Sequence, residues 1–156
     1  MAIGDQLADV LLLACEWVAQ QEQMILHVGV PLTAAQFADA RQVGVQHPGQ
    51  VRLLSVPAIP LPADPHLHAA AQATRFLTPD TIGLTLRYGI YLRVDYWGDR
   101  ALLAHELVHS AQYERLGGVE PFLRQYFGEV LAVGYARAPL EQEAVRVSRK
   151  LMKRAG

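Results

Sequence analysis

The sequence predicts an α+β fold, and three features of its pattern support that class. Stretches near both ends repeat apolar residues every three or four positions, which is typical of amphipathic helices. Residues 81–94 alternate apolar and polar side chains around a short turn, which predicts a β-hairpin. An apolar run over residues 99–116 then predicts a buried helix. We therefore expect a small, mostly antiparallel sheet packed on a central helix.

Composition narrows the class of protein. The chain has 156 residues, 51% of them apolar, which predicts one folded domain over residues 1–156. A net charge of −1 argues against binding to nucleic acid or to an anionic membrane. Cys15 is the single cysteine and excludes a cysteine-based zinc site. Because the start lacks a basic leader and no apolar stretch is long enough to span a bilayer, we expect a cytoplasmic protein.

The amino-terminal half begins with a long helix. Apolar residues at helical spacing predict that it runs from about residue 3 to residue 27. Thr33 begins a short second helix that extends to about Val43, and residues 51–56 form a strand. Four prolines between residues 57 and 65 then predict an irregular connection.

His66 and His68 follow these prolines. A His-x-His pair on a strand points both rings the same way and binds metal in some proteins. Since the sequence offers no third ligand nearby, we expect a surface pair ahead of a helical turn at residues 69–73.

The carboxyl-terminal half supplies the remaining elements. The hairpin pairs residues 81–86 with residues 90–94, and its edge offers a place for an extended peptide. After the central helix, residues 121–131 and residues 140–153 predict two more helices. The exposed face and carboxyl end of the last helix carry a basic cluster, made of Arg146, Arg149, Lys150, Lys153 and Arg154.

The central helix contains the pattern His105-Glu106-x-x-His109. Residues four apart lie on the same helical face, so both imidazoles point to one place beside the helix. A Zn²⁺ ion there lowers the pKa of a bound water towards about 7, and Glu106 takes its proton as a general base. Two histidines and a glutamate in an apolar helix need partners, and a metal supplies one.

A catalytic zinc normally has a third protein ligand. In one known arrangement a glycine follows three residues after the second histidine and the third ligand, a histidine, follows six residues after it, but those positions hold Gln112 and Arg115. The ligand must therefore come from another segment, and Glu141 and Glu143 in the last helix are the best placed carboxylates.

These motifs resemble the zincin metallopeptidases of the gluzincin type, and in particular small bacterial zincin-like domains. The resemblance rests on His105–His109 and on the downstream Pro139–Ala144 segment. It implies a minimal zincin-like domain in which Glu141 is the third zinc ligand and Glu143 belongs to the surroundings. It also implies a residue that stabilises the oxyanion, for which Tyr135 is our candidate.

Other residues remain open for these supporting roles. Arg137, like Tyr135, lies just ahead of the last helix and is also a candidate to stabilise the oxyanion. Tyr126 and Tyr88 are weaker candidates for the same role. Glu129 or Glu143 is expected to orient the histidines.

We thus expect a zinc-dependent metallopeptidase with a peptide or protein substrate. The alternative is a regulatory or interaction module that binds metal without catalysis. A metal site open to a cleft favours the enzyme, and a closed site favours the module.

Overall fold

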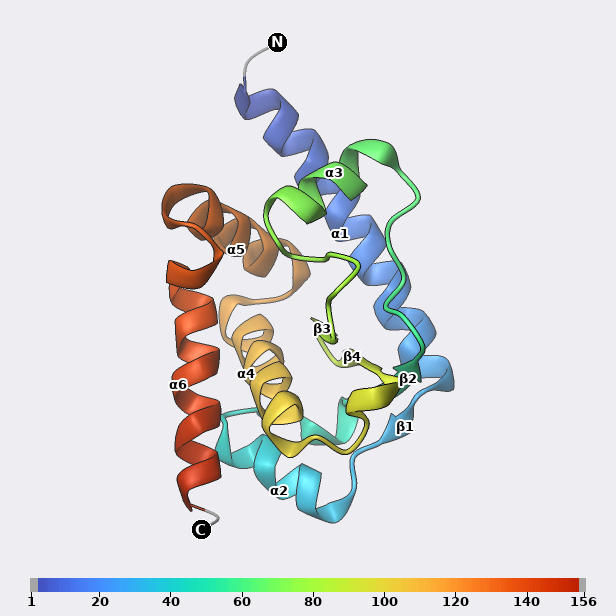
Figure 1. Cartoon of the computed structure of the whole chain (residues 1–156), viewed down its shortest axis with the longest axis vertical. Helices are drawn as coiled ribbons and strands as arrows, with labels where there is room; N and C mark the ends of the chain where they lie inside the picture. Colours follow the sequence, from blue (N-terminus) through green and yellow to red (C-terminus); the bar gives the residue numbers. More distant parts are fainter. Residues whose placement is uncertain (1–2, 155–156) are drawn as a thin grey trace.

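The computed structural model describes the backbone of residues 3–154 and the side chains of residues 8–154. Helices and a small sheet across these residues confirm the α+β class (Figure 1). The helices are α1 (Ile3–Val28), α2 (Ala34–Gln42), α3 (Pro65–Ala73), α4 (Arg100–Leu116), α5 (Val119–Val133) and α6 (Pro139–Arg154). The strands are β1 (Val30–Pro31), β2 (Arg52–Val56), β3 (Gly83–Leu86) and β4 (Gly89–Arg93). Short 3₁₀ helices are η1 (Pro48–Gln50), η2 (Val94–Tyr96) and η3 (Tyr135–Arg137).

The sheet is mixed, which corrects the expectation of a mostly antiparallel one. Its strand order is β1-β2-β4-β3, with antiparallel outer pairs and a parallel central pair, β2 with β4. The predicted hairpin is present as β3 and β4. Parallel strands need a long crossover, which here includes α3 and β3. A hairpin is visible in local sequence, whereas this parallel pairing depends on distant segments.

Both faces of the sheet are covered, so the alternation in the hairpin does not separate a buried face from a wet one. Helix α1 packs against β2, β3 and β4, while α4 packs against β3 (Figure 1). Leu84 and Tyr91 belong to the cluster that includes α1, whereas Ile90 and Leu92 belong to the cluster that includes α4. Thr85 is also buried, although its polarity suggested an exposed position.

The ends of the central helix lie where capping chemistry places them. Asp99 accepts a hydrogen bond from the backbone N–H of Leu102 and caps the amino end of α4. Gly117 ends the helix in the left-handed conformation, with φ of 102°, which a residue without a side chain adopts readily. Thr33 caps α2 in the same way as Asp99 caps α4.

Helix α3 begins earlier than expected, which changes the setting of the histidine pair. Asp64 caps it and Pro65 occupies its first turn, so His66 and His68 lie within the helix. His66 is exposed, and the Nδ1 atom of His68 lies 3.3 Å from the carbonyl oxygen of Pro62. Among residues 3–154, no helix has the length and apolar content needed to cross a membrane.

Candidate metal centre

Helix α4 presents His105, Glu106 and His109 from its buried middle section. The rings of His105 and His109 lie 5.0 Å apart between centroids, one turn from each other. His109 is almost fully buried, whereas the side chain of His105 keeps 22% of its surface exposed. The helix therefore places one imidazole in the interior and the other at the edge of the protein surface.

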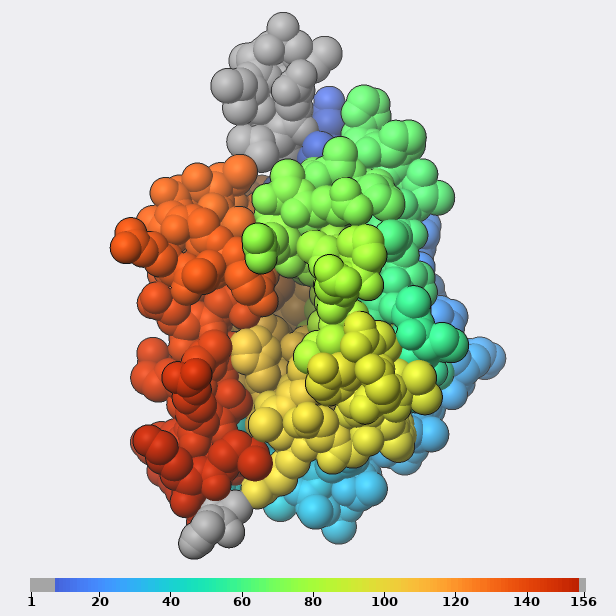
Figure 2. All heavy atoms as spheres, viewed as in Figure 1, coloured from blue at the N-terminus to red at the C-terminus, as the bar shows by residue number. Residues whose placement is uncertain are grey.

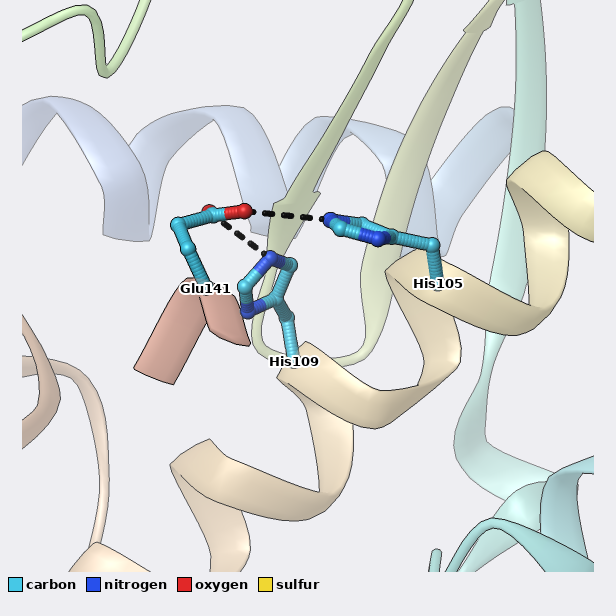
Figure 3. Close-up of side chains that lie close together, drawn as sticks. All are labelled: His105, His109 and Glu141. Carbon is cyan, nitrogen blue, oxygen red and sulfur yellow. Dashed lines mark hydrogen bonds and ion pairs between the residues drawn. The ribbon is translucent and has the colours of Figure 1, made fainter. Parts of the chain in front are cut away.

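Glu141 lies opposite these rings on the first turn of α6 (Figure 3). Its Oε2 atom lies 3.2 Å from Nε2 of His105, and its Oε1 atom lies 3.0 Å from Nε2 of His109. The three residues form a group whose ligand atoms all lie within 4.8 Å of one another. The structure thus brings together the three residues that the sequence suggested as metal ligands.

The side chains of Glu141 and His109 shift each other's pKa towards the charged forms. Burial alone lowers the pKa of His109, but the hydrogen bond and negative charge of Glu141 outweigh it and raise the pKa to about 9. Burial likewise raises the pKa of Glu141, but hydrogen bonds with His105 and His109 reverse that effect and hold the pKa well below its usual range. Glu141 is therefore a carboxylate, the form that binds a cation.

A chain of hydrogen bonds behind His109 fixes its ring. Nδ1 of His109 lies 2.7 Å from Oε1 of Gln112, and Nε2 of Gln112 donates to the Leu140 carbonyl and to Glu143. An amide oxygen accepts, so Nδ1 carries the proton and, in the neutral ring, Nε2 is the free nitrogen. Arg115 forms an ion pair with Glu143, in which Nη2 of Arg115 lies 3.0 Å from Oε1 of Glu143. Glu143 therefore supports His109 through Gln112 and lies apart from the His105–His109–Glu141 group.

Glu106 is also buried, and the sheet holds it. The hydroxyl of Thr85 on β3 donates to Oε1 of Glu106 at 2.9 Å and lies 2.9 Å from the Glu106 backbone oxygen. A side chain on Gly83 would meet Cγ of Glu106 at 3.2 Å, so the missing side chain lets β3 approach α4 closely. The carboxylate of Glu106 thus has a fixed position beside the histidines.

The tyrosine and arginine candidates are placed differently from one another. Tyr126 donates its hydroxyl proton to Oε1 of Glu141 at 3.1 Å. Tyr135, on η3, lines the cleft described below, and burial followed by the negative charge of Glu141 raises its pKa. Tyr88 donates to Glu114, away from the group, and Arg137 does not line the cleft.

Of the two carboxylates expected to orient the histidines, Glu143 does so through Gln112 and Glu129 does not. Instead of orienting a histidine, its Oε1 atom accepts the backbone N–H of Leu140 at 2.8 Å and so caps the first turn of α6. Glu129 therefore positions Glu141 through the backbone of α6. The sequence did not predict this role, because Glu129 lies on a different helix, α5.

An open cleft of about 640 Å³ reaches the group. In Figure 2 it is the hollow between the orange-to-red carboxyl-terminal helices and the green-to-yellow segment around residues 75–83. His105, Glu106, His109 and Glu141 all line it, and residues 82–85 of the β3 edge form the opposite wall. His66 and His68 do not line this cleft.

Sequence reasoning missed Thr85 and the bridging role of Gln112. Gln112 lies one turn from His109 on the same helix, so its spacing is a usable signal. Thr85 has no such signal, because its contact with Glu106 crosses from strand to helix.

Comparison of the chain with family models, curated proteins and solved structures gave no match.

Proposed function

We propose that this protein is a zinc-dependent metallopeptidase that hydrolyses peptide bonds. The observation that carries the proposal is the convergence of His105, His109 and Glu141 at the floor of an open cleft, with a buried glutamate beside them. The gluzincin-like motifs in the sequence agree with this reading.

The donor set suits zinc. Two imidazole nitrogens and one carboxylate are a common catalytic zinc set. With metal–ligand distances of about 2.0–2.2 Å, two ligands of one tetrahedral ion lie roughly 3.3–3.6 Å apart. The two oxygens of Glu141 lie 3.2 Å from His105 and 3.0 Å from His109, slightly closer than this spacing, and the ligand atoms of the group all lie within 4.8 Å of one another. Gln112 contacts Nδ1 of His109, so Nε2, which faces Glu141, is the nitrogen that would bind the metal, as the outer contacts of metal-binding histidines usually arrange.

The chain's own residues then have separate roles. Bound zinc supplies a Lewis acid that polarises the substrate carbonyl and acidifies water. Glu106 takes the proton of the attacking water and returns it to the leaving amine nitrogen. Tyr135 lines the cleft and, as a phenol that keeps its proton at neutral pH, donates a hydrogen bond to the developing oxyanion. The free edge of β3 pairs with the substrate backbone.

The non-catalytic metal-binding module remains the second candidate. A closed site would favour it, but here the cleft exposes His105 and admits a molecule much larger than water. This observation supports the enzyme over the module.

Zinc content and hydrolysis test the proposal together. We expect the purified protein to hold about one zinc and to cleave a proteome-derived peptide library, with loss of cleavage after chelation and recovery with Zn²⁺. Glu106→Gln should keep the zinc and lose about 10²–10⁴-fold in hydrolysis, the usual contribution of a general base.

Glu16→Gln is the matched control, because Glu16 is exposed on α1, away from the cleft. It should change neither zinc content nor cleavage. Full hydrolysis by the Glu106→Gln variant would remove Glu106 as the base, and a zinc-loaded protein that cleaves nothing would favour the module.

A further inference from the structure

A second groove, of about 650 Å³, opens from the metal centre along α6. Five residues line both this groove and the cleft: His105, Tyr135, Glu141, Val145 and Arg149. The groove and the cleft therefore adjoin at the metal centre.

The wall of this groove is basic. Its cations are Arg146, Arg149, Lys150 and Lys153, which are all exposed. Steps of three, one and three residues place them on one helical face. Among the side chains of residues 8–154, none of these four forms an ion pair with a carboxylate. Their charge is therefore available to a ligand.

The excess of positive over negative side chains lies on the groove side of the metal centre. Within the described part of the chain, the only carboxylate that lines the groove is Glu141, which belongs to the metal centre. The cleft on the other side carries Asp80 and Asp99 together with Arg75, and it shares Arg149 with the groove. A substrate that extends both ways thus meets cations in the groove and a more mixed surface in the cleft.

We propose that this groove binds acidic side chains of the peptide substrate, on one side of the bond that is cut. The inference rests on the proposed peptidase function and adds a substrate class to it. Residues 146–153 span roughly 12 Å of helix, the length of about three to four residues of extended peptide. Among the described residues that line the groove, the only aromatic rings are those of Tyr135 and His105, and His105 belongs to the metal centre, which gives little surface for stacking of bases.

Cleavage of a peptide library tests the specificity. The zinc-loaded protein should cut preferentially where aspartate or glutamate lies within about four residues on one fixed side of the bond. In a variant with Arg146→Gln, Lys150→Gln and Lys153→Gln, the ratio of acidic to neutral cleavage sites should fall towards one. An unchanged ratio in this variant would overturn the proposal.

A charge-matched control replaces Arg41, Arg124 and Arg154 by glutamine. These side chains are exposed and line neither the groove nor the cleft. The control should keep the acidic preference, whereas equal losses in both variants would show an effect of net charge alone and contradict a specific groove.

A binding measurement separates this inference from the peptidase proposal. Zinc-loaded protein carrying Glu106→Gln should bind a fluorescent glutamate-containing peptide about tenfold more tightly than its glutamine counterpart, with the difference reduced by salt and lost in the groove variant. The binding measurement remains informative even if the wild-type protein cleaves nothing. Absence of cleavage would refute only the peptidase proposal. Equal affinity for the two peptides, or tighter binding of a labelled single-stranded oligonucleotide, would overturn the inference.

Discussion

Helices α4 and α6 lie side by side and both face the metal centre, but they are built differently (Figure 1). Helix α4 is buried from Leu103 to Tyr113 apart from His105, and its polar side chains there have partners in the sheet or in α6. Helix α6 is buried along one stripe, contributes Glu141 from its first turn and turns a basic face outward. Under the proposed function, α4 would carry the chemistry in a fixed frame, while α6 would complete the metal site and contact the substrate.

The largest effect should come from removing the one ligand that α6 contributes. Glu141→Ala should weaken zinc binding by more than the roughly 100-fold that outer contacts can supply, because a charged donor is lost. Zinc content after gel filtration measures it. Glu16→Gln, which changes an exposed carboxylate on α1 away from the cleft, is the control, and it should retain zinc. If Glu141→Ala bound zinc as tightly as the wild type, our ligand set would be wrong.

The next largest effect should follow from breaking the link between the two helices. Gln112→Leu removes the acceptor for Nδ1 of His109 and the donor to the Leu140 carbonyl and Glu143. Zinc affinity, measured by competition with a chelator, should fall about 10–100-fold. Unchanged affinity would show that the ring of His109 is held by packing alone.

A smaller effect should appear at the contact between the sheet and α4. Thr85→Val removes the hydroxyl that donates to Oε1 of Glu106. Hydrolysis should fall about tenfold with zinc content unchanged, since a hydrogen bond to a charged group contributes roughly 1.5–3 kcal/mol. Thr85→Ser should restore the rate, because it returns the hydroxyl. A loss that serine does not rescue would point to packing instead.

The smallest effects should come from the caps of the two helices, and they should differ in kind. Asp99→Ala and Glu129→Ala should each lower the free energy of unfolding of the metal-free protein by about 1 kcal/mol, as measured in urea. Only Glu129→Ala should also weaken zinc binding, because Glu129 caps the turn that carries Glu141. Equal zinc affinity in both variants would contradict this difference between the helices.

Much of the framework was predictable because it depends on neighbours in the chain. Asp99 and Gly117 mark the ends of α4, and helical spacing places His105 and His109 on one face. The hairpin at residues 83–93 is equally local. The choice of Glu141 over Glu143 rested on a resemblance between motifs, and only the structure shows the contacts of Glu141 with both histidines.

The rest depends on contacts between segments far apart in the chain. The parallel pairing of β2 with β4, the hydrogen bond from Thr85 to Glu106, and the role of Glu129 each join separate elements. Periodicity reports which side of an element is apolar, but it does not report which element will pack there.

The sequence by itself determined the helix that carries two histidines and a glutamate, because a helical repeat converts spacing into direction without help from the rest of the chain. The tertiary structure alone decided that Glu141 meets those histidines, that Thr85 holds Glu106, and that the basic face of α6 borders the metal centre. Those facts follow from the packing of α6 and β3 against α4. Local sequence patterns are compatible with many ways of packing these elements together, and the burial of apolar surface decides which one forms.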